Sequence, residues 1–202
     1  MIYGAKYWND PDAWYTQTNN PTEEMLRKIF KENKLLISFL ESCGGTGSVN
    51  CIAVHYNIQA RQKKLEIKCP GVYRPQPEEV LTDHFNDPRN YKALKREREN
   101  IGPADLPGNR VPQYFPLAVK EVFDFDCIFW WIETHHVLAD FFKKGYSIQL
   151  CLKTPSHYVA GVAFDSMSSE IIVNDYIGFN RRISDMYNLE NFAILYPPPS
   201  KE

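Results

Sequence analysis

The sequence of 202 residues is long enough for one domain with a full hydrophobic core. Hydrophobic residues make up 44% and charged residues 24%, a balance that excludes disordered and collagen-like chains. The formal net charge of −2 gives no indication of nucleic acid or an anionic membrane as a partner. We therefore expect a single domain over residues 1–202, with no nucleic acid and no membrane among its partners.

The first half of the chain predicts helices around a glycine-rich turn. We expect residues 1–20 to be irregular, and Thr22 to cap a helix whose first turn is acidic. The glycines after Cys43 break any strand, and the apolar residues that follow recur at helical spacing. This pattern predicts a helix from about residue 44 to about residue 60, with Cys43 at its N-terminus.

Prolines and mixed charges dominate the middle of the chain. Eight prolines between residues 68 and 118 exclude long strands there. We interpret the segment of about 60–125 as a Pro-rich insertion that carries one or two short helices, at about 89–100 and 116–123. The insertion can cover one side of a cleft or serve only as a connection, and the sequence does not choose between these.

The C-terminal third predicts an antiparallel sheet. A helix over residues 137–145 ends on two lysines and a glycine, which are typical helix stop signals. Short turns separate the strands that follow, so neighbouring strands are expected to pair as hairpins. The predicted strands cover 146–153, 157–164, 170–174 and 191–196. Helices first and strands last predict an α+β fold, with N-terminal helices packed on a C-terminal antiparallel sheet.

Five cysteines stand at irregular spacing: Cys43, Cys51, Cys69, Cys127 and Cys151. An odd number in a chain of this length is no disulfide framework, so we expect reduced thiols. The N-terminus has no apolar signal core, and no stretch reaches the roughly 18 apolar residues of a membrane span. These features predict synthesis in the cytoplasm, with release at lysis if the protein is a phage-type lysin.

Cys43 has the setting that a nucleophilic thiol needs. A free thiol is mostly protonated at neutral pH, and both a helix N-terminus and a nearby imidazolium favour the thiolate. The backbone amides at such a terminus can also stabilise an oxyanion. Cys43 is therefore the candidate nucleophile, whereas Cys51 and Cys151 are expected to pack in the core.

His157 and Asp175 are the candidate partners of this thiol. His157 opens one predicted strand and Asp175 closes the next one. In an antiparallel hairpin the start of one strand lies beside the end of the other, so the two side chains should be neighbours. A base that is oriented by a carboxylate completes a Cys-His-Asp triad.

The same residues carry a resemblance to a known family. The segment CGGTGSVNCIA at 43–53 resembles the Cys-Gly-Pro-Thr/Ala-Ser opening of papain-like peptidases of the bacteriocin-leader-processing (double-glycine) type. HYVAGVAFD at 157–165 is similar to their His-Tyr-Val-Val-Val-x-Gly-Tyr-Asp strand, and IIVND at 171–175 to their Val-x-Val-Asn-Asp-Pro strand end. The resemblance covers about residues 35–58 and 135–176. It implies a papain-like fold with Cys43 as nucleophile, His157 as base and Asp175 as orienting acid.

The oxyanion hole departs from the family pattern. The family usually has a glutamine six positions before the cysteine, where this chain has Ile37. The candidate donors and substrate-binding groups are therefore Gly44, Ser38 and Asn174, together with the Cys43 amide. The missing glutamine keeps open a catalytically silent domain that binds a peptide in the same cleft.

The predicted activity is hydrolysis of amide bonds in a peptide or in the peptide part of peptidoglycan. An acyltransferase would use the same residues with a different acceptor. Glu133, His135 and His136 suggest half of a di-iron motif, but no second copy accompanies them. We therefore expect no metal and no cofactor.

Overall fold

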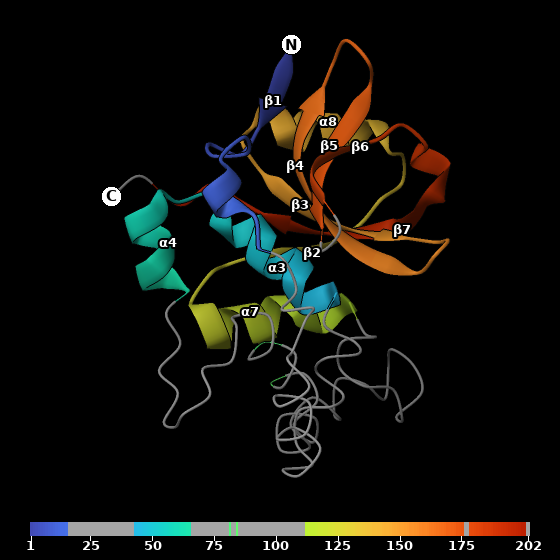
Figure 1. The fold of residues 1–202 in the computed structure, drawn as a ribbon. Coiled ribbons are helices and arrows are strands. Elements are labelled where there is room, and N and C mark those ends of the chain that lie inside the picture. Colours follow the sequence, from blue (N-terminus) through green and yellow to red (C-terminus); the bar gives the residue numbers. More distant parts are fainter. Residues whose placement is uncertain (16–42, 66–80, 82–83, 85–111, 176–177, 201–202) are drawn as a thin grey trace, which may run out of the picture.

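The computed structural model describes residues 1–15, 43–65, 81, 84, 112–175 and 178–200. These residues form an α+β fold in which helices cover an open antiparallel sheet (Figure 1). The strands are β1 (Ile2–Gly4), β2 (Ile128–Trp131), β3 (Ser147–Leu152), β4 (His157–Asp165), β5 (Glu170–Asp175), β6 (Gly178–Ile183) and β7 (Leu189–Tyr196). The helices are α3 (Cys43–Ala53), α4 (Ile58–Lys64), α7 (Phe115–Phe123) and α8 (His136–Lys143). Short 3-10 turns are η1 (Pro11–Ala13), η3 (Pro112–Tyr114) and η4 (Met186–Asn188).

The strand order is β2-β7-β3-β4-β5-β6, and β1 pairs with β4. Three consecutive strands, β3 to β5, form the hairpins that the sequence predicts. β1 pairs with residues 163–165, beyond the part of β4 that pairs with β3. The expectation of an irregular segment over 1–20 is therefore wrong for Ile2–Gly4. A strand of three residues has no readable periodicity and exists only through its pairing.

The glycine-rich helix α3 is buried along nearly its whole length, from Gly44 to Ala53. A Cβ on Gly44 would lie 2.8 Å from Cζ of Phe115, and one on Gly47 would lie 3.2 Å from Nε2 of Gln149. Each glycine costs about 1 kcal/mol of helix propensity relative to alanine. Here the glycines allow α3 to approach α7 and the sheet closely.

The predicted helix over about 44–60 is two helices instead of one. α3 ends at Ala53, and α4 begins after Asn57, whose side-chain oxygen accepts a hydrogen bond from the Ala60 N–H at 2.9 Å. A side-chain cap of this kind satisfies an otherwise unpaired amide and starts a new helix. Apolar spacing alone does not reveal the break.

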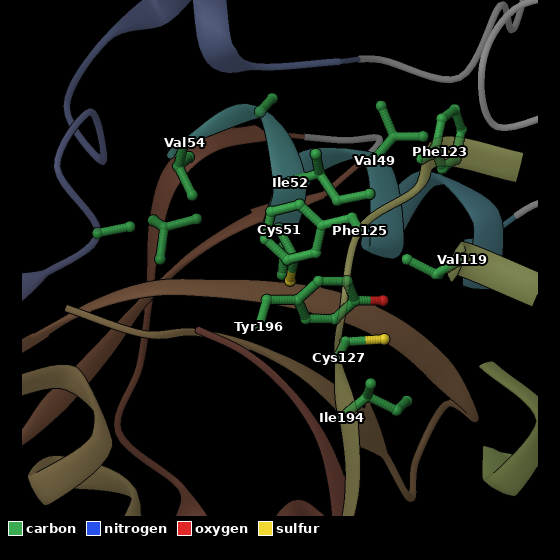
Figure 2. Packing of buried hydrophobic residues seen from close by; sticks show 14 of the residues in the cluster. Val49, Cys51, Ile52, Val54, Val119, Phe123, Phe125, Cys127, Ile194 and Tyr196 are labelled. Atoms are coloured by element: carbon green, nitrogen blue, oxygen red, sulfur yellow. The ribbon is translucent and has the colours of Figure 1, made fainter. Parts of the chain in front are cut away.

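Two hydrophobic clusters lie on opposite faces of the sheet. On one face, α3 and α7 pack against β4, β5 and β7, and Figure 2 shows Val49 and Ile52 above Ile194 and Tyr196. On the other face, α8 contributes Leu138 to the second cluster. Burying one such side chain stabilises the fold by about 1.5–3 kcal/mol. Not all helices are N-terminal, because α8 lies between β2 and β3 in the chain.

A buried polar network ties the start of α3 to the sheet. Gln149 on β3 donates from Nε2 to the Gly44 carbonyl oxygen at 2.9 Å. The Tyr196 hydroxyl donates to Oε1 of Gln149 at 2.8 Å and lies 2.9 Å from the Ser48 hydroxyl. Buried polar groups are costly unless paired, so this network favours one position of α3 on the sheet. It therefore fixes the turn that carries Cys43.

The remaining predictions have mixed outcomes. The helix predicted at 116–123 corresponds to α7, and the one at 137–145 corresponds to α8. The strand predicted at 191–196 begins earlier, at Leu189, while β2 and β6 were not predicted. The helices expected after Thr22 and at 89–100 lie outside the described residues.

Candidate functional site

Cys43 is the first residue of α3, and its side chain is half-buried. The first amides of a helix have no partner within the helix and carry partial positive charge, which stabilises a nearby anion. Gly44 follows in the first turn, as expected for a backbone donor beside the thiol. The helix therefore gives Cys43 the electrostatic setting that a thiolate requires.

Cys43 lies close to the paired strands β3 and β4, as its effect on residues of both strands shows. The pKa of Cys151 is raised to about 11, chiefly by burial and also by the charges of Glu190 and Cys43. Burial also raises the pKa of Tyr158, with Cys151 and Cys43 as additional causes. Cys151 pairs with Tyr158 across β3 and β4. Cys43 thus lies within electrostatic range of both strands, at the end of β4 where His157 begins.

His157 is the first residue of β4, and its ring is largely buried. Burial lowers its pKa from the ordinary value of 6.5, the Asp175 carboxylate opposes this, and the Arg181 guanidinium lowers it further. The ring nitrogen that faces Asp175 is Nε2. Nδ1 is therefore the nitrogen that can exchange a proton with a thiol.

Asp175 is the last residue of β5 and lies next to His157, as the hairpin geometry predicts. The distance from His157 Nε2 to Asp175 Oδ2 is 3.9 Å, which exceeds hydrogen-bond length. The carboxylate is 1% exposed. The structure thus brings the two residues together as an electrostatic pair.

Arg181 on β6 is a partner of Asp175 that the sequence did not reveal. Its Nη1 lies 2.6 Å from Asp175 Oδ2, the same oxygen that His157 faces. The backbone N–H of Gly178 donates to Oδ1 at 2.9 Å. A buried carboxylate is stabilised by such charged and backbone donors. Arg181 and His157 therefore share one carboxylate oxygen.

Trp14, in the N-terminal segment, contacts the backbone of Asp175. Its Nε1–H donates to the backbone oxygen of Asp175 at 2.7 Å, and its ring lies 6.0 Å from that of Phe179. The indole therefore links residues near the N-terminus to the end of β5. A long-range contact of this kind leaves no local sequence pattern.

Two of the three predicted oxyanion or substrate groups are described. Gly44 is buried in the first turn of α3, whereas Ser38 lies outside the described residues. Asn174 is fully buried, and its Oδ1 accepts from the Asn180 N–H at 2.9 Å. Its Nδ2 has no hydrogen-bond partner among the described residues. Asn174 therefore links β5 to β6 through this bond.

A cavity of about 870 Å³ lies elsewhere, at the other end of α3. His55, Tyr56 and Phe123 are among the residues that line it. An α-helix rises about 1.5 Å per residue, so the eleven residues of α3 separate this cavity from Cys43. The cavity does not contribute to the candidate site.

Comparison of the chain with protein-family models, curated proteins and solved structures found no match. Within the described ranges no helix is long and apolar enough to cross a membrane. The same part of the chain contains no group of three or more histidine, cysteine or acidic side chains that can hold a metal ion. Any function must therefore be argued from the site itself.

Proposed function

We propose that the protein is a papain-like cysteine hydrolase that cleaves amide bonds in peptides or in the peptide part of peptidoglycan. The observation that carries this proposal is the position of Cys43 at the start of a buried helix, beside the strand that begins with His157. Thiol hydrolases need a nucleophile, a base and a group that orients the base. Cys43, His157 and Asp175 supply these three roles.

The reaction follows from the groups at hand. His157 Nδ1 takes the proton of the Cys43 thiol, and the sulfur attacks the carbonyl carbon of the substrate amide. Backbone amides in the first turn of α3 stabilise the oxyanion. The imidazolium then protonates the leaving amine, and water, activated by the same imidazole, releases the acyl group from sulfur.

Asp175 has an electrostatic part in this mechanism. Its carboxylate favours the imidazolium that forms during attack, although Arg181 holds the shared oxygen at 2.6 Å. A shift of about 1 Å would bring His157 within hydrogen-bond distance of Asp175. Hydrogen bonds of catalytic groups are often long without substrate and shorten when it binds.

The geometry around Asp175 also favours a second function. Because Arg181 forms the short contact with Asp175 and His157 the long one, the carboxylate can serve the arginine in place of the imidazole. A silent domain of this kind would bind a peptide beside these residues and lack thiolate reactivity. The two functions differ in a single measurable property, hydrolysis.

The experiment uses the full chain with a peptide library and purified peptidoglycan, and detects new termini by mass spectrometry. We expect cleavage by the wild-type protein and none by Cys43→Ala or Cys43→Ser. Cys127→Ala is the matched control, since Cys127 is buried and its pKa is raised to about 12, chiefly by burial. Cleavage that survives Cys43→Ala would overturn the assignment, and peptide binding without cleavage would establish the silent domain.

A further inference from the structure

The cavity of about 870 Å³ beyond the C-terminal end of α3 takes no part in the candidate site. Its walls come from the N-terminal segment, the turn after α3, α4, the end of α7 and the segment before the C-terminus. Figure 1 shows α4 beside that last segment. Small-molecule sites in proteins commonly have volumes of about 300–1,000 Å³, with apolar walls and a few polar groups. The cavity therefore has the size of a ligand site.

The apolar walls of the cavity are held in place by packing. His55 and Tyr56 both contact the Phe125 ring, at centroid distances of 5.8 and 6.2 Å. Phe123, at the end of α7, is only 4% exposed. The prolines at 198–199 form a further wall, and the fixed φ of proline keeps such a segment stiff. The cavity thus offers an apolar, partly aromatic surface of defined shape.

Three lysines make the lining cationic. Lys63 and Lys64 lie in the last turn of α4, Lys6 lies in the N-terminal segment, and all three line the cavity. Among the described residues these lysines form no ion pair. Lys64 Nζ donates to the Asp124 backbone oxygen at 2.6 Å, which places this ammonium at the wall that the end of α7 forms. The three positive charges therefore gather around one apolar cavity.

The carboxylates in the lining are bonded to other side chains. Glu121 Oε2 lies 2.7 Å from His84 Nε2, and Asp124 Oδ1 lies 2.7 Å from Lys120 Nζ. Neither His84 nor Lys120 lines the cavity. The lysines of the lining are thus left to a ligand, and a cationic lining favours a ligand with negative charge.

The elements that carry the lysines are fixed to the rest of the fold. Arg61 on α4 is 1% exposed, and it donates from Nη1 to the Tyr56 backbone oxygen and from Nη2 to Asp10 Oδ2, both at 2.9 Å. The N–H groups of Ala5 and Tyr7 donate to backbone oxygens of β4 and of the end of α3, at 3.0 and 2.8 Å. The lysine between these two residues is therefore held at its place beside the cavity.

We propose that this cavity binds a small organic anion, with a carboxylate, sulfonate or phosphate group beside Lys6, Lys63 and Lys64 and an aromatic or other apolar body against Tyr56 and Phe123. The inference is independent of the proposed function, because the cavity lies away from Cys43. The enclosed volume suits a small molecule better than a long acidic polypeptide, which would contact the same charges only from outside.

The probe is anilinonaphthalene sulfonate, a fluorescent aromatic anion, and phenylnaphthylamine is its uncharged counterpart without the sulfonate. Fluorescence titration of the full chain gives the Kd of each. The triple variant Lys6→Gln, Lys63→Gln, Lys64→Gln should weaken the sulfonate about tenfold, because each partly exposed charge contributes modestly. It should leave the uncharged probe within twofold. Lys63→Gln alone, at an exposed position, should weaken the sulfonate about twofold.

The matched control is the triple variant Lys143→Gln, Lys144→Gln, Lys153→Gln, which removes the same number of charges away from the cavity. It should bind both probes like the wild type. Ala60→Trp places a large side chain in the lining and should weaken both probes at least tenfold. Ile58→Trp, at a 46% exposed position of the same helix outside the lining, should not.

Circular dichroism establishes that each variant is folded. Equal losses in the two triple variants would show an effect of net charge alone and would overturn the inference. It would equally be overturned by unchanged binding in Ala60→Trp, or by a wild type that does not bind the sulfonate. Polyglutamate that binds more tightly than the sulfonate, with the same dependence on the three lysines, would identify an acidic polypeptide as the ligand instead.

Discussion

The two ends of α3 carry the same residue types in opposite chemical settings. At the N-terminal end Cys43 is half-buried and has the helix amides nearby, and a Cβ on the adjacent Gly44 would lie 3.6 Å from the Tyr158 ring on β4. Towards the C-terminal end Cys51 is fully buried, and His55 just beyond the helix contacts Ser147 Oγ at 3.0 Å through Nε2. Burial raises the pKa of Cys51 and lowers that of His55 to about 4. Position on the helix and access to solvent, not residue type, therefore separate a candidate site from a core.

The largest expected difference between the two ends is in thiol reactivity. Iodoacetamide at pH 7.5 should alkylate Cys43 roughly a thousandfold faster than Cys51, because Cys51 is buried and protonated. Mass spectrometry of tryptic peptides gives both rates from one sample. Cys51→Ala should leave the Cys43 rate unchanged, and similar rates at the two sites would contradict the comparison.

Substitution of His157 should lower activity, whereas substitution of His55 should lower stability. His157→Gln should lower kcat/KM for peptide cleavage about a thousandfold through loss of the base, with little loss of stability. His55→Gln should lower the free energy of unfolding by about 1–3 kcal/mol, since it disturbs buried hydrogen bonds, and should leave kcat/KM of the folded protein nearly unchanged. Kinetics and urea denaturation of both variants measure the two effects. Loss of activity in both variants to the same extent would refute the distinction.

Acid should destabilise the fold through His55. Its folded pKa of about 4 lies below the ordinary 6.5, so the unfolded chain binds more protons between these values. The contribution of neutral His55 to the free energy of unfolding is fully present above pH 6.5. It is lost as the pH falls towards 4, by up to about 3 kcal/mol. Urea denaturation at pH 7 and pH 4.5 measures the loss, which should be smaller in His55→Gln. An equal loss in the variant would exclude His55 as its source.

The smallest expected effect concerns Arg181 and its neighbour on β6. Arg181 lowers the pKa of His157, and its removal also strengthens the influence of Asp175, so Arg181→Met should raise that pKa. The acid limb of the pH profile of kcat/KM should move to higher pH. Arg182→Met is the control, because Arg182 pairs with Asp165 and Glu170 instead. An unchanged limb in Arg181→Met, or equal shifts in both variants, would contradict the assigned role.

The hairpin that holds His157 and Asp175 could be predicted because its signals are local. Between Ser147 and Asp175, runs of strand-forming residues are separated by short runs of turn residues. The antiparallel pairing of these strands then places the start of β4 beside the end of β5. The helix at Cys43 was predictable for the same reason, from glycines followed by helical spacing. Local pattern therefore sufficed for the α+β class and for the neighbours of the candidate base.

The rest of the site depends on contacts that local pattern does not encode. Arg181 reaches Asp175 because β6 pairs with β5, and the polar sequence of β6 gave no strand signal. Gln149 is a single amide within an apolar strand, which indicates a buried hydrogen bond. Its partner, the Gly44 carbonyl, is known only once α3 packs on the sheet. The edge strand β2 is a short apolar run, and periodicity cannot decide whether such a run is a strand or a helix. Tertiary pairing supplies each of these features.

The most direct test of the account is the rate of Cys43 alkylation between pH 5 and pH 9, in the wild type and in His157→Gln. If the helix start and the imidazole together stabilise the thiolate, Cys43 reacts rapidly at pH 6 and slows at least tenfold in the variant. Identical profiles in both proteins, with Cys43 inert until the range of an ordinary thiol near pH 8.5, would contradict the account.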